Sequence, residues 1–181
     1  MYDSKYIGKV LEKADPQASA TILGCDEYKN LNGKVCLYDI GSAILVTTSL
    51  YGIPDKSGYC QHPILGLHIH EGKSCSGNSE DHFADAMGHY NPHDCQHPEH
   101  AGDLPPLFVN EGTAWSAVIT TRFTIKEITG RTVIVHSMPD DFHSQPSGNS
   151  GKKIACGVIR KLTLVQAEQH KSNTPQQSYG A

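Results

Sequence analysis

The chain has 181 residues, a net charge of −4 and a mean hydropathy of −0.40, values that fit a single domain with a hydrophobic core. It contains no basic run and few aromatic residues, so we expect no nucleic-acid partner. No stretch approaches the roughly 20 apolar residues of a membrane helix, so we expect no membrane partner.

The N-terminal residues contain neither an apolar core nor a cleavage site. This predicts a cytoplasmic location for the chain as written, or an extracytoplasmic one if a leader has been removed. The six cysteines point the other way, because an even count permits disulfides, which are uncommon in reducing compartments.

Short β-branched runs separated by turn residues recur along the chain, at residues 18–24, 33–40, 43–52, 65–70, 113–125, 131–136 and 153–159. Such spacing, without long helical periods, predicts an all-β fold, an antiparallel sandwich or barrel. Two long loops interrupt the pattern, at 71–110 and 137–152, and loops of this length are usually functional. We therefore divide the chain into an N-terminal extension (1–14), a β domain (15–162) and a polar, disordered tail (163–181).

Several histidines lie on the predicted strands or at their ends, at spacings that could bind a metal ion. His68 and His70 are two residues apart on a strand, so their side chains point to the same face, where they could bind one metal ion. His136 ends another apolar strand and could complete that site. The alternative is a pair of exposed or hydrogen-bonded strand histidines.

The first long loop offers a second ligand set, namely His89, His97, His100 and Asp103. Three nitrogens and one oxygen make a tetrahedral set that suits structural zinc. Because the loop has little apolar content, a metal would supply the free energy that orders it. The alternative is a solvated loop with adventitious metal affinity.

Five separated motifs carry a resemblance: GLHIHEG, GHYNP, HAGDLP, VIVHSMPDD and KKIACGVI. In residue type and order they resemble the copper/zinc superoxide dismutase family, over roughly residues 15–160. HAGDLPPL and EGKSCSG are similar to bacterial members in particular. The resemblance implies a Greek-key β-sandwich or flattened barrel of about eight antiparallel strands.

The resemblance also implies the roles of individual residues. Asp140 would link a copper ligand to a zinc ligand from outside, with its neighbour Asp141 as the alternative of an exposed loop charge. His93 and Cys95 could compete with His97 for zinc. His89 would bridge both ions and carry a proton. The implied copper ligands are His68, His70, His89 and His136, and the implied zinc ligands are His89, His97, His100 and Asp103.

The implied reaction is dismutation of superoxide by copper redox cycling, with zinc in a structural role. Lys153 occupies the position of the family's arginine at the copper channel, so it would keep the charge but lose the planar fork of donors. The family implies a disulfide between Cys75 and Cys156 and allows a homodimer. The pairing of the other cysteines stays open, with Cys25 facing Cys36, or Cys60 facing Cys95, as alternatives to free thiols.

Two other functions compete with the enzyme. One is a metal-delivery or storage domain of the same fold without turnover, although such relatives often lose a copper ligand. The other is a structural β-sandwich with a zinc-bound loop only, which would leave His68, His70 and His136 without a reason to be apposed.

Overall fold

The computed structural model describes residues 2–54 and 63–162. In chain order the elements are α1 (Ser4–Lys13), β1 (Ala18–Gly24), η1 (Asp26–Tyr28), β2 (Asn32–Asp39), β3 (Ile44–Tyr51), β4 (Ile64–His70), η2 (Ala84–Ala86), β5 (Asp103–Phe108), β6 (Ala114–Thr120), α2 (Ile125–Ile128), β7 (Thr132–His136), β8 (Lys153–Val158) and β9 (Arg160–Lys161). The predicted tail, 163–181, lies outside the described residues.

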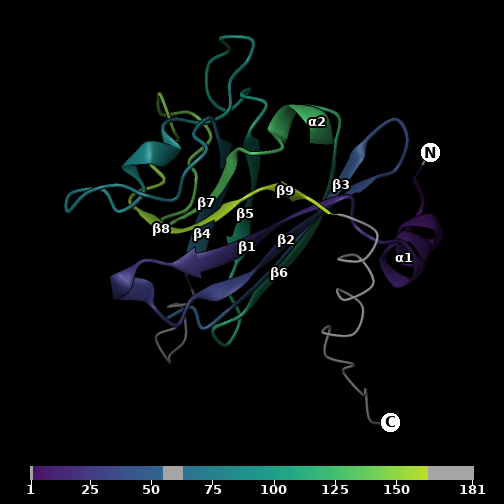
Figure 1. Cartoon of the computed structure of the whole chain (residues 1–181), viewed down its shortest axis with the longest axis horizontal. Coiled ribbons are helices and arrows are strands. Elements are labelled where there is room, and N and C mark those ends of the chain that lie inside the picture. Colours follow the sequence, from purple (N-terminus) through teal and green to yellow (C-terminus); the bar gives the residue numbers. More distant parts are fainter. Residues whose placement is uncertain (1, 55–62, 163–181) are drawn as a thin grey trace.

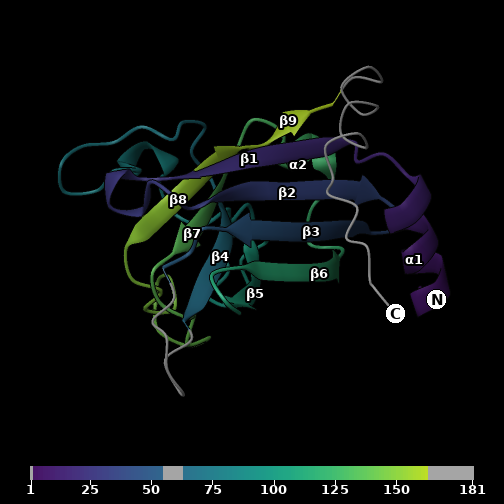
Figure 2. The ribbon, with the colours of Figure 1, turned by 90° about the horizontal axis from the view of Figure 1, so that it is seen from below.

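The strands form one antiparallel sheet in the order β5-β4-β7-β8-β1-β2-β3-β6, with the short β9 paired to β1 (Figures 1 and 2). The two end strands, β5 and β6, also contact each other, so the sheet curls into a nearly closed barrel. The predicted all-β antiparallel barrel is confirmed.

Alternation along the strands separates the core from the face that carries the histidines. In β4, Leu65, Leu67 and Ile69 belong to the main hydrophobic cluster, and His68 and His70 therefore point to the opposite face. That outer face is also buried, so every residue of β4 after Ile64 is shielded from solvent. β7 follows the same rule, with Val133 and Val135 in the core cluster and His136 on the other face.

The predicted loop 71–110 is too long, because its last part is strand β5. Pro105 and Pro106 lack a backbone donor, and this conceals the strand in the sequence. β5 tolerates them because it lies at one end of the strand order, where the ladder with β4 shifts register between Leu65 and Leu67. The strand predicted at 113–125 is also shorter, since it ends at Thr120 and α2 begins after a capping box.

The sequence pattern does not predict α1. Asp3 caps this helix by accepting a hydrogen bond from the backbone N–H of Tyr6, and Ile7 and Val10 pack on a small cluster that includes Ile40 and Leu45. Both views place α1 at the end of the barrel far from the loop that carries η2 (Figures 1 and 2). In the described part of the chain, every helix is too short or too polar to span a membrane.

Candidate metal centre

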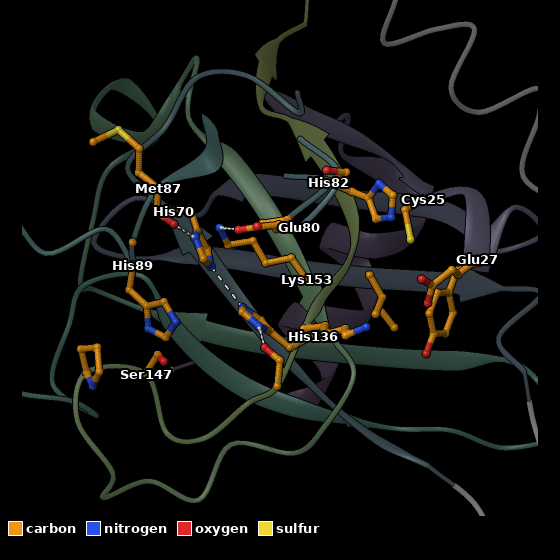
Figure 3. A pocket seen from close by; sticks show the side chains of 18 residues that line it. Cys25, Glu27, His70, Glu80, His82, Met87, His89, His136, Ser147 and Lys153 are labelled. Carbon is orange, nitrogen blue, oxygen red and sulfur yellow. Dashed lines mark hydrogen bonds and ion pairs between the residues drawn. The ribbon is translucent and has the colours of Figure 1, made fainter. Parts of the chain in front are cut away.

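The predicted histidines of the first set converge. The four side chains are all buried, and one ligand atom from each lies within 4.8 Å of the others. They are His68 and His70 from β4, His89 from the loop after β4, and His136 from β7. Three of them share the outer face of neighbouring strands, because β4 pairs with β7 and places Ile134 opposite His68. Figure 3 shows His70, His89 and His136 around one pocket.

The loop brings His89 to the strands through backbone hydrogen bonds. The N–H of Tyr90 donates to the carbonyl of Ile69 at 2.8 Å, and the N–H of Gly102 donates to the carbonyl of Tyr90 at 2.9 Å. Position 102 must be glycine, because a Cβ there would overlap the Ile69 carbonyl. As a result, His89 and His70 face each other in an isolated antiparallel bridge.

The second set also converges, on the other side of His89. Asp103 accepts a hydrogen bond from His89 Nδ1 at 2.7 Å and another from the backbone N–H of His100 at 3.1 Å. His97 Nδ1 lies 3.0 Å from the second Asp103 oxygen. The buried ligand atoms that lie within 4.8 Å of one another belong to His89, His97, His100 and Asp103. The competing residue His93 is exposed and Cys95 half-buried, and neither joins this cluster.

Asp140 joins the two sets from outside. Its carboxylate accepts from His68 Nε2 and from His97 Nε2, both at 2.8 Å, and its side chain is only 1% exposed. Burial by itself raises the pKa of Asp140, but the hydrogen bond from His68 leads the effects that bring it down to about 2. The alternative, Asp141, instead caps a turn by accepting from the backbone N–H of Ser144.

The orientation of the rings tests whether metal ions fit. Each of His68, His70, His97 and His136 uses one ring nitrogen to bind a protein oxygen, which is how metal-ligating histidines are usually oriented. The remaining nitrogens of His68 (Nδ1) and His89 (Nε2) are buried without a hydrogen-bond partner among the described residues, and that of His97 (Nδ1) lies 3.0 Å from an Asp103 oxygen without forming a hydrogen bond. Such orphaned buried acceptors are costly unless a ligand satisfies them.

One further contact supports the same conclusion. Nε2 of His70 and Nε2 of His136 face each other at 3.2 Å, although both rings already donate from Nδ1. Two lone pairs at that distance repel unless a cation or a shared proton lies between them. The two donor sets therefore fit two metal ions that share the His89 ring.

Burial keeps the imidazoles of His68, His70 and His136 in the neutral form that binds metals. Desolvation is the main reason that the pKa of His68 is lowered and that of His70 falls well below its usual value. Desolvation, helped by the neighbouring His68, lowers the pKa of His136 to about 3. Neutral rings with free lone pairs are ready to coordinate near neutral pH.

A disulfide joins Cys75 to Cys156, as predicted, and ties the first loop to β8. Cys25 and Cys36 do not pair with each other, since Cys36 lies opposite Ser19 in the sheet and Cys25 follows the far end of β1. Both are buried, which supports the alternative of apolar thiols. Cys95 keeps its thiol, and Cys60 lies outside the described residues.

Two side chains that the sequence reasoning missed hold the loops around the metal sets. The guanidinium of Arg122 donates from Nη1 to the carbonyls of Pro98, His100 and Asp103, at 3.1, 3.2 and 3.4 Å. Gln145 accepts from the N–H of His97 at 3.0 Å and donates to its carbonyl at 2.8 Å. No sequence signal marks either residue, because both act on backbone groups brought near by the fold.

Lys153 lies beside the first set. The ladder between β7 and β8 shifts register so that Lys153, rather than Ile154, lies opposite His136. Its side chain lines the pocket of about 560 Å³ that His70, His89 and His136 also line (Figure 3). An anion entering this pocket would therefore meet an ammonium group close to the histidines.

Comparisons with known proteins agree with this geometry. The profile of the family described as copper/zinc superoxide dismutase (SODC) matches residues 31–159. The chain is 35% identical to superoxide dismutase [Cu-Zn] 2 of Aquifex aeolicus over 143 residues, which are 71% of this chain and 78% of that protein. It is 37% identical to superoxide dismutase [Cu-Zn] of Photobacterium leiognathi over 109 residues, 52% of this chain and 63% of that protein.

The structure is also similar to the Cu/Zn superoxide dismutase of Brucella abortus, with a TM-score of 0.64 and 25% identity, over 78% of this chain and 98% of that one. Both metals that the family name specifies are consistent with the two histidine sets. The fold, the shared histidine and the match over most of the chain together place this protein in the copper/zinc superoxide dismutase family.

Proposed function

We propose that the protein is a superoxide dismutase, which converts two superoxide anions and two protons into dioxygen and hydrogen peroxide. The observation that carries this proposal is the position of His89, whose ring belongs to both buried ligand sets. A loop that bound zinc alone would not need a histidine that belongs to two ligand sets.

We assign the four-nitrogen set, His68, His70, His89 and His136, to copper, because imidazole nitrogens suit that metal. The set with three nitrogens and a carboxylate, His89, His97, His100 and Asp103, is assigned to zinc. When bound, copper supplies the one-electron oxidation and reduction that zinc cannot supply.

The chain's own residues supply proton handling and substrate guidance. His89 Nδ1 is held by Asp103 on the zinc side, so Nε2 is the ring atom that can hold a proton on the copper side. Lys153 supplies the inward-facing ammonium that an entering anion meets beside the histidines, which matters because the whole chain is net negative. Asp140 keeps the rings of His68 and His97 in their metal-binding orientation.

The test pairs elemental analysis with an assay of superoxide removal on freshly purified protein. We expect about one copper and one zinc per chain and removal of superoxide that cyanide inhibits. The variant His89→Gln should lose turnover while the protein still folds around its disulfide. Full metal loading without superoxide removal would instead support the alternative, a metal-delivery or storage domain, which the intact set of four histidines disfavours.

Assembly and compartment belong to the same proposal. We keep the homodimer as a prediction, to be checked by sedimentation; Phe108 and Trp115, each 65% exposed, offer apolar surface for it.

The Cys75–Cys156 disulfide favours the extracytoplasmic alternative, because such bonds persist in oxidising compartments. Fractionation of the native cells followed by thiol labelling tests that assignment.

A further inference from the structure

Lys153 is the inward-facing cation of the copper-side pocket, but its charge is already engaged. The ammonium donates to Asp81 Oδ2 at 2.7 Å and to the carbonyl of Phe83 at 3.1 Å, and the side chain is only 15% exposed. An ammonium has three N–H donors, so one is left for an entering anion.

Asp81 is held in place for this contact. Its other oxygen, Oδ1, accepts from the backbone N–H of Phe83 at 3.0 Å, and its own N–H donates to Asn78 at 3.0 Å. Partial burial raises the pKa of Asp81, but the hydrogen bond from Lys153 and further contacts outweigh it, and the net shift is downward. The carboxylate is therefore ionised at neutral pH, and it faces Lys153 as a full negative charge.

The rest of the pocket does not restore a positive field. Its lining includes three carboxylates but only two lysines, namely Glu27, Glu80, Asp81, Lys152 and Lys153. Of these, Glu27, Glu80 and Lys152 are exposed, so salt and solvent screen them. Among the charged side chains of the pocket, the half-buried pair of Asp81 and Lys153 is therefore the one that an anion meets with the least screening next to the histidines.

We propose that Asp81 is a positioning residue that sets the anion affinity of the copper-side pocket by compensating the charge of Lys153. The pocket then holds small anions less tightly than an unpaired lysine at this position would. The inference rests on the proposed function for the identity of the natural anion, superoxide, but the compensation applies to any small anion that enters.

The test measures azide binding to the copper- and zinc-loaded protein by optical titration of the copper absorption. Asp81→Asn should tighten azide binding by about two- to fivefold, the range expected for loss of a partly exposed ion pair. Asp81→Glu, which keeps the charge, should remain near the wild-type affinity. Asp81→Ser gives the same comparison if the asparagine variant does not fold.

Glu80→Gln is the matched control, because it removes one negative charge from the same pocket, at an exposed residue. If Glu80→Gln and Asp81→Asn tighten azide binding equally, or if Asp81→Asn weakens it, the proposal is overturned. In a Lys153→Met background the effect of Asp81→Asn should shrink to that of Glu80→Gln, and a full effect there would also overturn it. Failure of the wild-type protein to remove superoxide would count against the proposed function alone, since azide affinity does not depend on turnover.

Discussion

At the scale of single residues, Asp140 links the two ligand sets without belonging to either. One buried carboxylate holds His68 of the first set and His97 of the second, each through Nε2. Gly148 makes this possible, because a Cβ at that position would overlap the Asp140 carboxylate. Ring orientation in both sets therefore depends on one acidic residue that contributes no ligand atom.

Replacement of Asp140 by asparagine should weaken both metal sites. The amide can accept a hydrogen bond from one ring but turns its NH₂ toward the other, so one imidazole loses its orientation. We expect the affinity for copper and for zinc each to fall about 10- to 100-fold, measured by competition with chelators. Asp141→Asn, next to it in the chain but outside both sets, is the control, and an equal loss in that variant would contradict the role of Asp140.

The buried histidines predict how the metal-free protein responds to acid. The pKa of His136 is lowered from 6.5 to about 3, so below pH 6.5 the unfolded chain takes up a proton that the folded chain refuses. The free energy of unfolding should fall as the pH drops from 6.5 toward 3, by up to about 1.4 kcal/mol per pH unit from this ring. Urea unfolding of chelator-treated protein measures it.

The matching variant is His136→Gln, which should flatten the acid dependence in that pH window. Above pH 6.5 the ring is neutral in both states, so it should contribute no slope there. Stability that rises on acidification between pH 6.5 and 3 would show that the ring is not held neutral by burial.

At the scale of elements, the centre depends on how two loops are fastened to a rigid sheet. β4 and β7 present their histidines by strand alternation alone, whereas the loop ligands need outside contacts. The disulfide secures the first loop to β8, and Arg122, just beyond β6, contacts its last turn through three carbonyls. The disulfide and the Arg122 hydrogen bonds each connect residues that are far apart in the sequence.

Loss of Arg122 should loosen the zinc site selectively. Because its guanidinium spans the backbone of Pro98, His100 and Asp103, Arg122→Ala should speed zinc release by roughly tenfold, with little effect on copper. Arg122→Lys should be intermediate, because an ammonium keeps a charged donor for these carbonyls but lacks the rigid planar geometry of the guanidinium. Zinc transfer to a chromogenic chelator gives the rate. Lys126→Ala, an exposed cation of α2, is the control, and a similar rise there would point to a general charge effect.

Removal of the disulfide should destabilise the chain as a whole. The bond spans 81 residues of sequence, and replacement of both Cys75 and Cys156 by serine should lower the free energy of unfolding by about 2–5 kcal/mol. Denaturant unfolding of the metal-free protein checks this value. Cys95→Ser, which alters a thiol outside the bond, should leave the stability nearly unchanged.

At the scale of the whole molecule, the hydrophobic core and the candidate metal ligands lie on opposite faces of the barrel strands. The core cluster fills the interior, the metal ligands lie on the outer face under the loops, and α1 covers the opposite end (Figures 1 and 2). We propose on this basis that the functional domain is 15–162 and that the residues before it are an accessory segment.

Deletion of residues 1–13 tests that boundary. It would uncover the apolar side chains of Ile40, Ala43 and Leu45, which pack with α1. We expect the melting temperature to fall by a few degrees because apolar surface becomes exposed, while copper and zinc content stays unchanged. Loss of either metal on truncation would show that the domain begins earlier than residue 15.

The sequence alone predicted the strands with regular alternation, and its motifs named the candidate ligands through their resemblance to a family. His68 and His70 could be placed on one face because side chains alternate along a strand, and the ordered motifs identified the loop ligands and the disulfide. Strand alternation is a local pattern, and the motifs are short stretches of sequence, so both can be recognised without the fold. β5 was missed because its prolines mask an edge strand, and α1 because its cap and short apolar face form a weak pattern.

Only the tertiary structure decided which groups act on the ligands from a distance. The contacts of Arg122 with three carbonyls and of Asp81 with Lys153 each join positions 19 or more residues apart, and it was the family resemblance, not any spacing, that implied the contacts of Asp140 with two rings. No periodicity or spacing reports such pairs, because the barrel's closure and the loop anchoring bring them together. Residue types alone indicate which side chains could bind metal. The contacts that orient those side chains form only in the folded chain.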